Sequence, residues 1–195
     1  MFYKKLNIDD FQQIQDKIVS YITKFVTEDV KASEEKFSEK VSFNFVSDEN
    51  LKKFKEDIPE LFEGIRRELG SEVILMALVY IDGIDQIPIH TDGDNSIKRR
   101  IRLHWPILNG ESAATIFYEK NHENVEAVFN SYKSGVSGWS FDSNDCHEID
   151  RYILDVPTLN NVKQLHGVEI LNDNLPRILL TMRLSNEEEV YQKHF

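Results

Sequence analysis

Residues 100–107 read Arg100-Ile101-Arg102-Leu103-His104-Trp105-Pro106-Ile107. Successive side chains of a β-strand point to opposite faces of the sheet, so every second residue shares a face. The apolar residues of this stretch therefore fall on one face, and Arg100, Arg102 and His104 fall on the other. We expect a strand with one side in a hydrophobic core and a basic, polar opposite side.

Residues 177–184 alternate in the same way. Ile178 and every second residue after it are apolar, whereas the other face carries Arg177, Leu179, Thr181 and Arg183. On an ordinary half-exposed sheet this second face would meet solvent. Helices elsewhere in the chain need a sheet surface to cover, and the apolar faces are their natural partners. The polar faces are then expected to line a barrel interior, which favours a ligand pocket over a dry core.

The remaining pattern predicts the fold class. Helical spacing of apolar residues predicts helices over residues 8–28 and 47–69, with a short strand at 41–45 and a solvated connection over 28–40. The apolar run Val73 to Ile81 predicts a strand covered on both faces. Further short strands are expected near residues 87–90, 100–107, 113–119, 136–141, 149–156, 163–170 and 177–184. This order indicates a mainly β, α+β chain: an antiparallel barrel or jelly roll braced by N-terminal helices. We expect one domain over 1–195, with a helical support region at 1–70 and a β-barrel core at 71–187.

Composition narrows the function classes. The chain has 34 acidic and 23 basic residues, a formal net charge of -11, which argues against nucleic acid as a partner. Its one dense basic cluster is Lys98, Arg99, Arg100 and Arg102. Neither a signal-peptide core nor a membrane span is visible in the sequence, and the single cysteine, Cys146, fits a reducing compartment. We expect a cytoplasmic protein without membrane association.

A His-x-Asp pair and a remote histidine form the candidate metal site. His90-Thr91-Asp92 follows a predicted strand, and His166 lies far downstream. Two imidazoles and one carboxylate are the facial triad of mononuclear non-haem Fe(II) sites, which leaves coordination positions open for chemistry. A surface loop pair is the alternative interpretation, and His122 and His147 compete with His166 as the remote ligand.

A turn signal places His166 relative to a basic residue. Asn172-Asp173-Asn174 separates residues 164–170 from 176–184 and predicts that these segments pair as a hairpin. His166 would then lie opposite about Leu180, on the order of 10 Å from Arg177. That distance suits a metal at one end of a small diacid and a guanidinium at the other.

The chain resembles the Fe(II)- and 2-oxoglutarate-dependent dioxygenases, which have a double-stranded β-helix, or cupin-like, fold. The resemblance rests on His90-x-Asp92, His166 and Arg177, over about residues 72 to 185. Arg100-x-Arg102-x-His104 looks like the aspartyl/asparaginyl β-hydroxylase branch, although animal members of that branch lack the metal-binding acid that Asp92 supplies.

The resemblance implies roles for these residues. His90, Asp92 and His166 would bind Fe(II), and Arg177 would hold the distal carboxylate of 2-oxoglutarate, with Arg183 as the competing anchor. Arg102 and His104 would neutralise the carboxylate nearer the metal, and Thr181 would add a hydroxyl contact. The reaction would hydroxylate a C–H of a peptide side chain, an amino acid or a small metabolite and release succinate and CO2.

Two other functions stay open from the sequence. A metal-binding cupin isomerase or decarboxylase would share the barrel and the histidines without needing a basic clamp. A non-enzymatic jelly-roll binding module would need no metal. The sequence leaves the substrate and the oligomeric state open.

Overall fold

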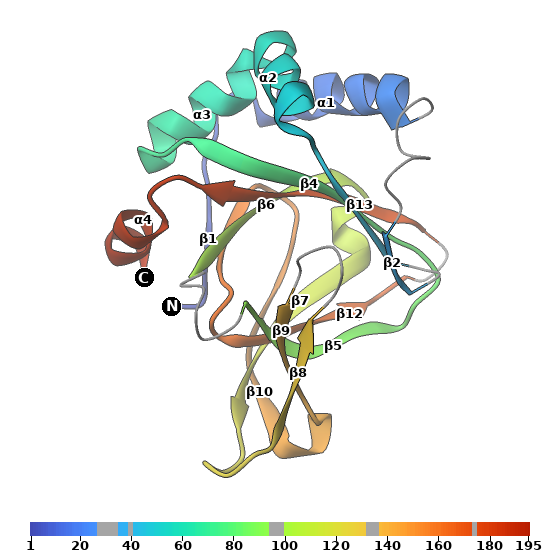
Figure 1. The fold of residues 1–195 in the computed structure, drawn as a ribbon, viewed down its shortest axis with the longest axis vertical. Helices are drawn as coiled ribbons and strands as arrows, with labels where there is room; N and C mark the ends of the chain where they lie inside the picture. The colour runs from blue at the N-terminus through green and yellow to red at the C-terminus, as the bar shows by residue number, and fades with distance from the viewer. Residues whose placement is uncertain (27–34, 39–40, 94–99, 132–136, 173–174) are drawn as a thin grey trace.

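Two antiparallel sheets face one another, and a layer of helices covers the outer side of one of them (Figure 1). The computed structural model describes residues 1–26, 35–38, 41–93, 100–131, 137–172 and 175–195. Lys98 and Arg99 of the predicted basic cluster, and Asp173 and Asn174 of the predicted turn, lie outside these ranges. The expected α+β jelly roll is confirmed.

The sheet beneath the helices, sheet A, has seven strands. Their spatial order is β1 (Tyr3–Lys5), β11 (Thr158–Asn161), β6 (Ile101–Leu108), β13 (Arg177–Leu184), β4 (Val73–Ile81), β3 (Val41–Phe45) and β2 (Glu35–Ser38). The opposing sheet B has six strands. Their order is β10 (Cys146–Ile153), β7 (Ala113–Lys120), β12 (Leu165–Ile170), β5 (Gln86–Asp92), β9 (Ser137–Phe141) and β8 (Ala127–Ser131).

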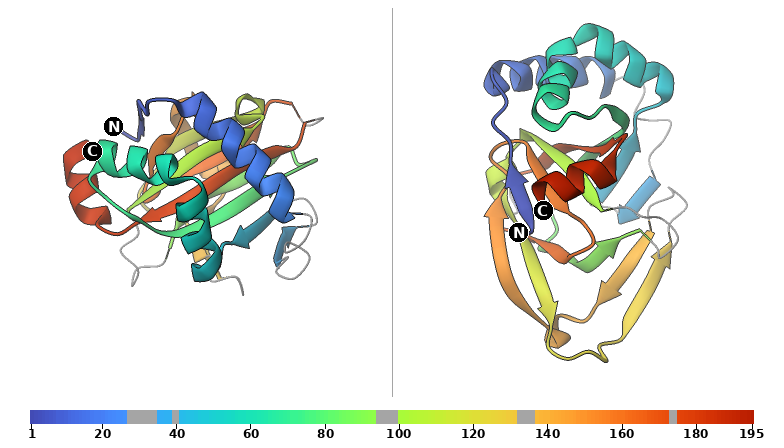
Figure 2. Two further views of the ribbon diagram at one scale, coloured as in Figure 1. Left: turned by 90° about the horizontal axis from the view of Figure 1, so that it is seen from above. Right: turned by 90° about the vertical axis from the view of Figure 1, so that its left-hand side faces the viewer.

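Helices α1 (Phe11–Val26), α2 (Asp48–Asp57) and α3 (Pro59–Leu69) lie on the outer face of sheet A (Figures 1 and 2). The single helix expected over 47–69 is wrong, because Ile58, at φ -133° and ψ 62°, precedes Pro59 and leaves the helical region. Ser47 caps α2, and Gly70 ends α3 at φ 66°. In the described part of the chain, no helix is both long and apolar enough to span a membrane.

The main core lies between these helices and sheet A. The alternating apolar residues of β6 and β13 enter it together with the buried faces of α1, α2 and α3. Trp105 and Leu180 are fully buried there, and so are Leu61 and Ile65 of α3. The predicted division of β6 and β13 into a covered apolar face and an inward polar face is therefore confirmed.

A second, smaller core lies between the two sheets. It contains Val79, Ile81, Phe117, Tyr152, Leu154 and Leu179. Because this cluster fills only part of the interior, the polar faces of β6 and β13 can line the rest. The short helices η2 (Gly110–Ser112) and η3 (Ser143–Asp145) join strands of sheet B or lead into them.

The predicted hairpin between β12 and β13 is wrong. Strand β12 pairs with β5 on one side and β7 on the other, whereas β13 pairs with β4 and β6. Both edges of β12 are thus occupied, and the chain crosses from sheet B to sheet A after Ile170. The expected pairing of His166 with Leu180 does not exist.

Several elements lie where none was expected. Strands β1 and β11 pair with each other, β8 pairs with β9, and β2 lies within the connection expected over 28–40. Helix α4 (Glu187–His194) follows the last strand. The first 70 residues therefore supply strands to sheet A as well as the supporting helices.

Candidate metal centre

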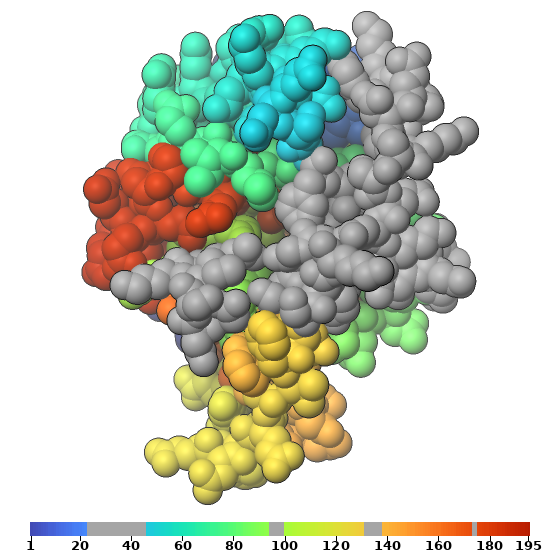
Figure 3. Space-filling model, in the orientation of Figure 1, coloured from blue at the N-terminus to red at the C-terminus, as the bar shows by residue number. Residues whose placement is uncertain are grey.

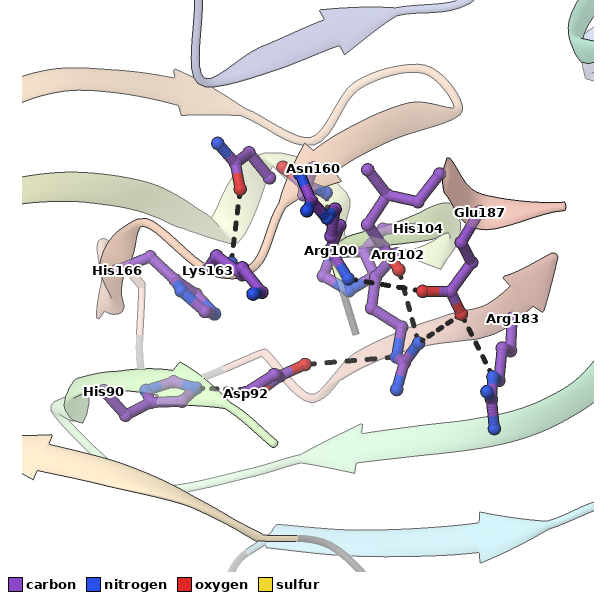
Figure 4. A network of polar contacts seen from close by, with 12 residues as sticks. His90, Asp92, Arg100, Arg102, His104, Asn160, Lys163, His166, Arg183 and Glu187 are labelled. Carbon is purple, nitrogen blue, oxygen red and sulfur yellow. Dashed lines mark hydrogen bonds and ion pairs between the residues drawn. The ribbon is translucent and has the colours of Figure 1, made fainter. Parts of the chain in front are cut away.

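Strands β5 and β12 bring His90, Asp92 and His166 together on the inner face of sheet B. His166 is the direct cross-strand partner of His90, and their ring centroids lie 4.3 Å apart. One candidate ligand atom from each of the three residues lies within 4.8 Å of the others. Figure 4 shows the three side chains pointing toward one another. In the part of the chain that the structure describes, no other cluster of His, Cys, Asp or Glu meets this geometry.

Backbone carbonyls orient both imidazoles. His90 Nδ1 donates to the Pro88 carbonyl at 2.7 Å, and His166 Nδ1 donates to the Gln164 carbonyl at 2.9 Å. A carbonyl oxygen can only accept, so Nδ1 carries a proton in each ring. Each Nε2 is then left with a lone pair, the tautomer that binds a metal.

Charge in the cluster fits a cation. Burial, and then the charge of nearby His90, lowers the pKa of His166 to about 4, so its ring is neutral at pH 7. Burial acts to raise the pKa of Asp92, but His166, His90 and Arg102 together lower it below its usual value. The site thus offers two imidazole nitrogens and one carboxylate, which suits a divalent metal ion.

Arg102 lies between the candidate ligand Asp92 and helix α4. Its Nε is 3.9 Å from Asp92 Oδ2, and its Nη1 donates to Glu187 Oε1 at 3.4 Å. Arg183 donates to the same Glu187 oxygen at 3.0 Å. Figure 4 shows Glu187 between the two guanidinium groups. Arg183 therefore already has a carboxylate partner.

His104 belongs to a buried polar chain that the sequence analysis did not include. Tyr152 donates to Asn160 Oδ1 at 2.6 Å, and Asn160 Nδ2 donates to His104 Nδ1 at 3.0 Å. Burial, and then the charge of Arg177, lowers the pKa of His104 to about 3. A neutral His104 protonated at Nε2 can donate a hydrogen bond into the interior. It cannot neutralise a carboxylate by charge, as the resemblance had implied.

Arg177 is 3% exposed and begins β13 on the inner face of sheet A. Its Nε is buried with no hydrogen-bond partner in the described residues. Burial lowers the pKa of this guanidinium, and Tyr152 acts in the opposite direction. A buried cation without a counterion is costly, so Arg177 is a candidate for binding an anion. Thr181 lies further along β13, opposite His104 of β6.

The other histidines and the cysteine lie elsewhere. His122 is 3.8 Å from Asp145, and His147 contacts Asn121 at 2.9 Å. Cys146 is buried and unpaired, and burial raises the pKa of its thiol. These contacts remove His122 and His147 as competitors for the third ligand position.

The sequence carried little signal for Asn160, Tyr152 and Glu187. Asn160 and its neighbour Asn161 have the composition of a turn rather than of a central strand. Glu187 begins a run of three glutamates, a pattern typical of a solvated helix start. Their contacts depend on strand and helix placement that local patterns do not determine.

No protein-family model and no curated protein sequence matches this chain. Solved structures do. The non-heme alpha ketoglutarate dependent epimerase SnoN from nogalamycin biosynthesis superposes with a TM-score of 0.52 at 6% identity, over 92% of this chain and 76% of that one. The fold is a cupin-like jelly roll.

Two further solved structures also match this chain. SnoN in complex with Fe3+, alpha ketoglutarate and nogalamycin RO gives a TM-score of 0.56 at 7% identity, over 92% of this chain and 77% of that one. Oxalate decarboxylase from Bacillus subtilis gives 0.37 at 12% identity. This jelly roll spans 28% of that decarboxylase chain, which covers 78% of the present one.

Proposed function

We propose that this protein is an Fe(II)- and 2-oxoglutarate-dependent oxygenase that acts on a C–H bond of a small molecule or a peptide. The observation that carries the proposal is Arg177, a buried guanidinium whose Nε has no partner in the described residues. It faces the same interior as the His90, Asp92 and His166 cluster. A metal site and a buried guanidinium that face the same interior fit a cosubstrate with a carboxylate at its far end.

The donor set fits iron. Two imidazole Nε2 atoms and the Asp92 carboxylate would bind Fe(II), with their orientation held by Pro88 and Gln164 carbonyls. When bound, Fe(II) and 2-oxoglutarate would supply O2 activation and the oxidising power to remove a substrate hydrogen.

Arg177 would bind the distal carboxylate of 2-oxoglutarate through two parallel N–H donors, because a planar guanidinium matches a carboxylate in geometry. His104 would donate from Nε2, since Asn160 occupies its Nδ1. Arg102 would hold Asp92 ionised and oriented through their 3.9 Å ion pair. The low exposure of Arg177 would strengthen its interaction with the anion by excluding water.

The comparison with SnoN supports 2-oxoglutarate as the cosubstrate more than it supports hydroxylation as the reaction. SnoN is described as an alpha ketoglutarate dependent epimerase, so a shared fold is compatible with more than hydroxylation. Our proposal of hydroxylation rests on the candidate iron ligands and on Arg177, whose buried Nε has no hydrogen-bond partner in the described residues. In a cupin isomerase or decarboxylase that does not use 2-oxoglutarate, Arg177 would have no cosubstrate carboxylate to bind.

Substitution of Arg177 tests the proposal. In Arg177→Ala we expect the Kd for 2-oxoglutarate, measured anaerobically on the iron-loaded protein, to rise at least about hundred-fold, because a desolvated charge pair is lost. Iron occupancy, measured separately by metal analysis, should change little, since Arg177 is not a metal ligand. Arg177→Lys should restore only part of the affinity.

Arg183→Ala is the matched control, because Arg183 lies on the same inner face of β13 but is paired with Glu187. We expect less than about a five-fold change in the Kd for 2-oxoglutarate in this variant. A larger effect for Arg183→Ala than for Arg177→Ala would transfer the anchor role to Arg183. Equal loss of iron and 2-oxoglutarate in Arg177→Ala would contradict the assigned role.

A further inference from the structure

One row of inward-facing residues crosses five strands of sheet B through the candidate metal site. Direct cross-strand partners share a face, and the row runs from β7 through β12, β5 and β9 to β8. Its members are Phe117, His166, His90, Ser140 and Val128. Phe117 is fully buried, His90 is partly exposed and Val128 is 65% exposed. Exposure to solvent therefore rises along the row from β7 to β8, which is the edge strand of sheet B.

Strands β8 and β9 form a two-stranded ribbon at the edge of sheet B (Figure 1), and Figure 3 shows atoms of this ribbon at the molecular surface. Neither strand contains a charged residue. The opposite sheet instead places Arg102, Arg177 and Arg183 toward the interior. The interior is thus divided into a basic side, suited to a diacid, and an uncharged side beside His90.

The uncharged side carries one hydrogen-bonded pair of polar side chains, Asn130 and Ser140, and both are partly exposed. Asn130 Nδ2 donates to Ser140 Oγ at 2.7 Å and to the Val128 carbonyl at 3.2 Å. The carbonyl can only accept, which establishes the orientation of the Asn130 amide. In the described residues, Asn130 Oδ1 has no donor and the Ser140 hydroxyl hydrogen has no acceptor. One acceptor and one donor are therefore free, next to each other and one strand away from His90.

Gly138 leaves the space between this pair and the metal ligands open. It lies opposite Asp92 on β5 and opposite Asn130 on β8. A Cβ at Gly138 would lie 2.1 Å from the Thr91 carbonyl oxygen, so β9 can approach β5 this closely only with glycine. No side chain therefore separates Asp92 from Asn130 along this row.

We propose that Ser140 and Asn130 form a substrate subsite for an uncharged amide, with Val128 contacting the apolar group attached to it. The amide carbonyl would accept from the Ser140 hydroxyl, and the amide N–H would donate to Asn130 Oδ1. A carboxylate lacks that N–H and would place its second oxygen, an acceptor, against the acceptor Asn130 Oδ1. This inference rests on the proposed oxygenase function, because it assigns the substrate class of the same site.

The test compares isobutyramide with isobutyrate, which have the same shape but differ in charge and in the N–H donor. The full chain is loaded with Zn(II), a diamagnetic substitute for Fe(II), and with saturating 2-oxoglutarate, which occupies Arg177. Ligand-observed NMR titration gives the Kd of each probe. We expect isobutyramide to bind at least about ten-fold more tightly than isobutyrate.

Variants connect this preference to the two residues. Ser140→Ala and Asn130→Ala should each weaken isobutyramide binding at least about five-fold. Phe129→Ala is the control, since Phe129 alternates with Val128 and Asn130 and packs against Trp139 on the outer face, with ring centroids 5.1 Å apart. It should leave the isobutyramide Kd unchanged. Circular dichroism of each variant verifies its fold.

Equal affinity for the two probes, absence of binding by both, or retained amide preference in Ser140→Ala and Asn130→Ala would each overturn the subsite. Failure of the proposed function has a different signature. In that case 2-oxoglutarate itself does not bind the metal-loaded wild type, whereas the dependence of isobutyramide binding on Ser140 and Asn130 can still be measured.

Discussion

Asn160 is 2% exposed and joins two groups that lie on different strands. It accepts from Tyr152 of β10 and donates to His104 of β6, so one amide connects sheet B to sheet A. Buried polar groups of this kind are costly when they lose a partner. The hydrogen bonds from Tyr152 to His104 therefore position the imidazole of His104. The charges of Arg177 and Asp92 both act on the pKa of that imidazole.

We predict that Asn160→Leu lowers the free energy of unfolding by about 1–3 kcal/mol, because it leaves His104 Nδ1 buried without a donor. Tyr152→Phe should cost less, about 1 kcal/mol, since only one hydroxyl is removed. Urea denaturation measures both values. A smaller loss in Asn160→Leu than in Tyr152→Phe would show that the amide does not hold this chain together.

The candidate ligands could be predicted from the sequence, whereas their surroundings could not. His90, Asp92 and His166 form a pattern of residue types with a known chemical use, and the pattern can be read without coordinates. Glu187 and Asn160 have ordinary identities and acquire their importance from contacts with residues 85 and 56 positions away. Such contacts depend on the global topology.

At the scale of elements, strand alternation was the reliable signal. The period-two alternation of apolar and polar residues in β6 and β13 is a local property, so the inward positions of Arg102, His104 and Arg177 followed directly from it. Strand pairing is not local. The turn-like residues after Ile170 predicted a hairpin, but β5 and β7 already occupy both edges of β12.

Helix α4 closes one end of sheet A and contains a buried histidine. His194 is 8% exposed, and Lys4 donates to its Nδ1 at 2.9 Å. Burial, and then the charges of Lys4 and Lys193, lowers the pKa of His194 in the folded state below its ordinary value of 6.5. The folded protein thus binds this proton less readily than the unfolded chain does.

The sign of the pH dependence follows from linkage. The neutral His194 contributes its full stability above pH 6.5, and this contribution is lost as the pH falls from there toward the folded-state pKa. We predict that the wild type loses more of its Tm between pH 7.5 and pH 5 than His194→Gln does, as measured by thermal denaturation in matched buffers at about these pH values. An identical loss in both proteins would show that His194 is not the responsible group.

At the scale of the whole molecule, the helices and the site use opposite faces of the same sheet. Helices α1, α2 and α3 bury the outer face of sheet A (Figure 2), and Arg102, His104 and Arg177 lie on its inner face. The core under the helices is thus separate from the candidate site. A substitution in the helical layer should therefore lower stability without changing ligand binding at that site.

Ile65 of α3 is fully buried in the helical layer. We predict that Ile65→Ala lowers the free energy of unfolding by about 2–5 kcal/mol, through lost burial and the cavity that remains. The Kd for 2-oxoglutarate, measured at a temperature where the variant is folded, should change less than two-fold or so. A large rise in that Kd would mean that the two layers are coupled.

The central claim, an iron site adjoining a carboxylate site, is tested most directly by anaerobic titration of the Fe(II)-loaded protein with 2-oxoglutarate, followed by visible absorption. We predict a weak charge-transfer band that saturates with 2-oxoglutarate, persists in Arg183→Ala and requires a much higher concentration in Arg177→Ala. Iron binding without the band would support a cupin that does not use 2-oxoglutarate. Absence of both iron binding and the band would contradict the account.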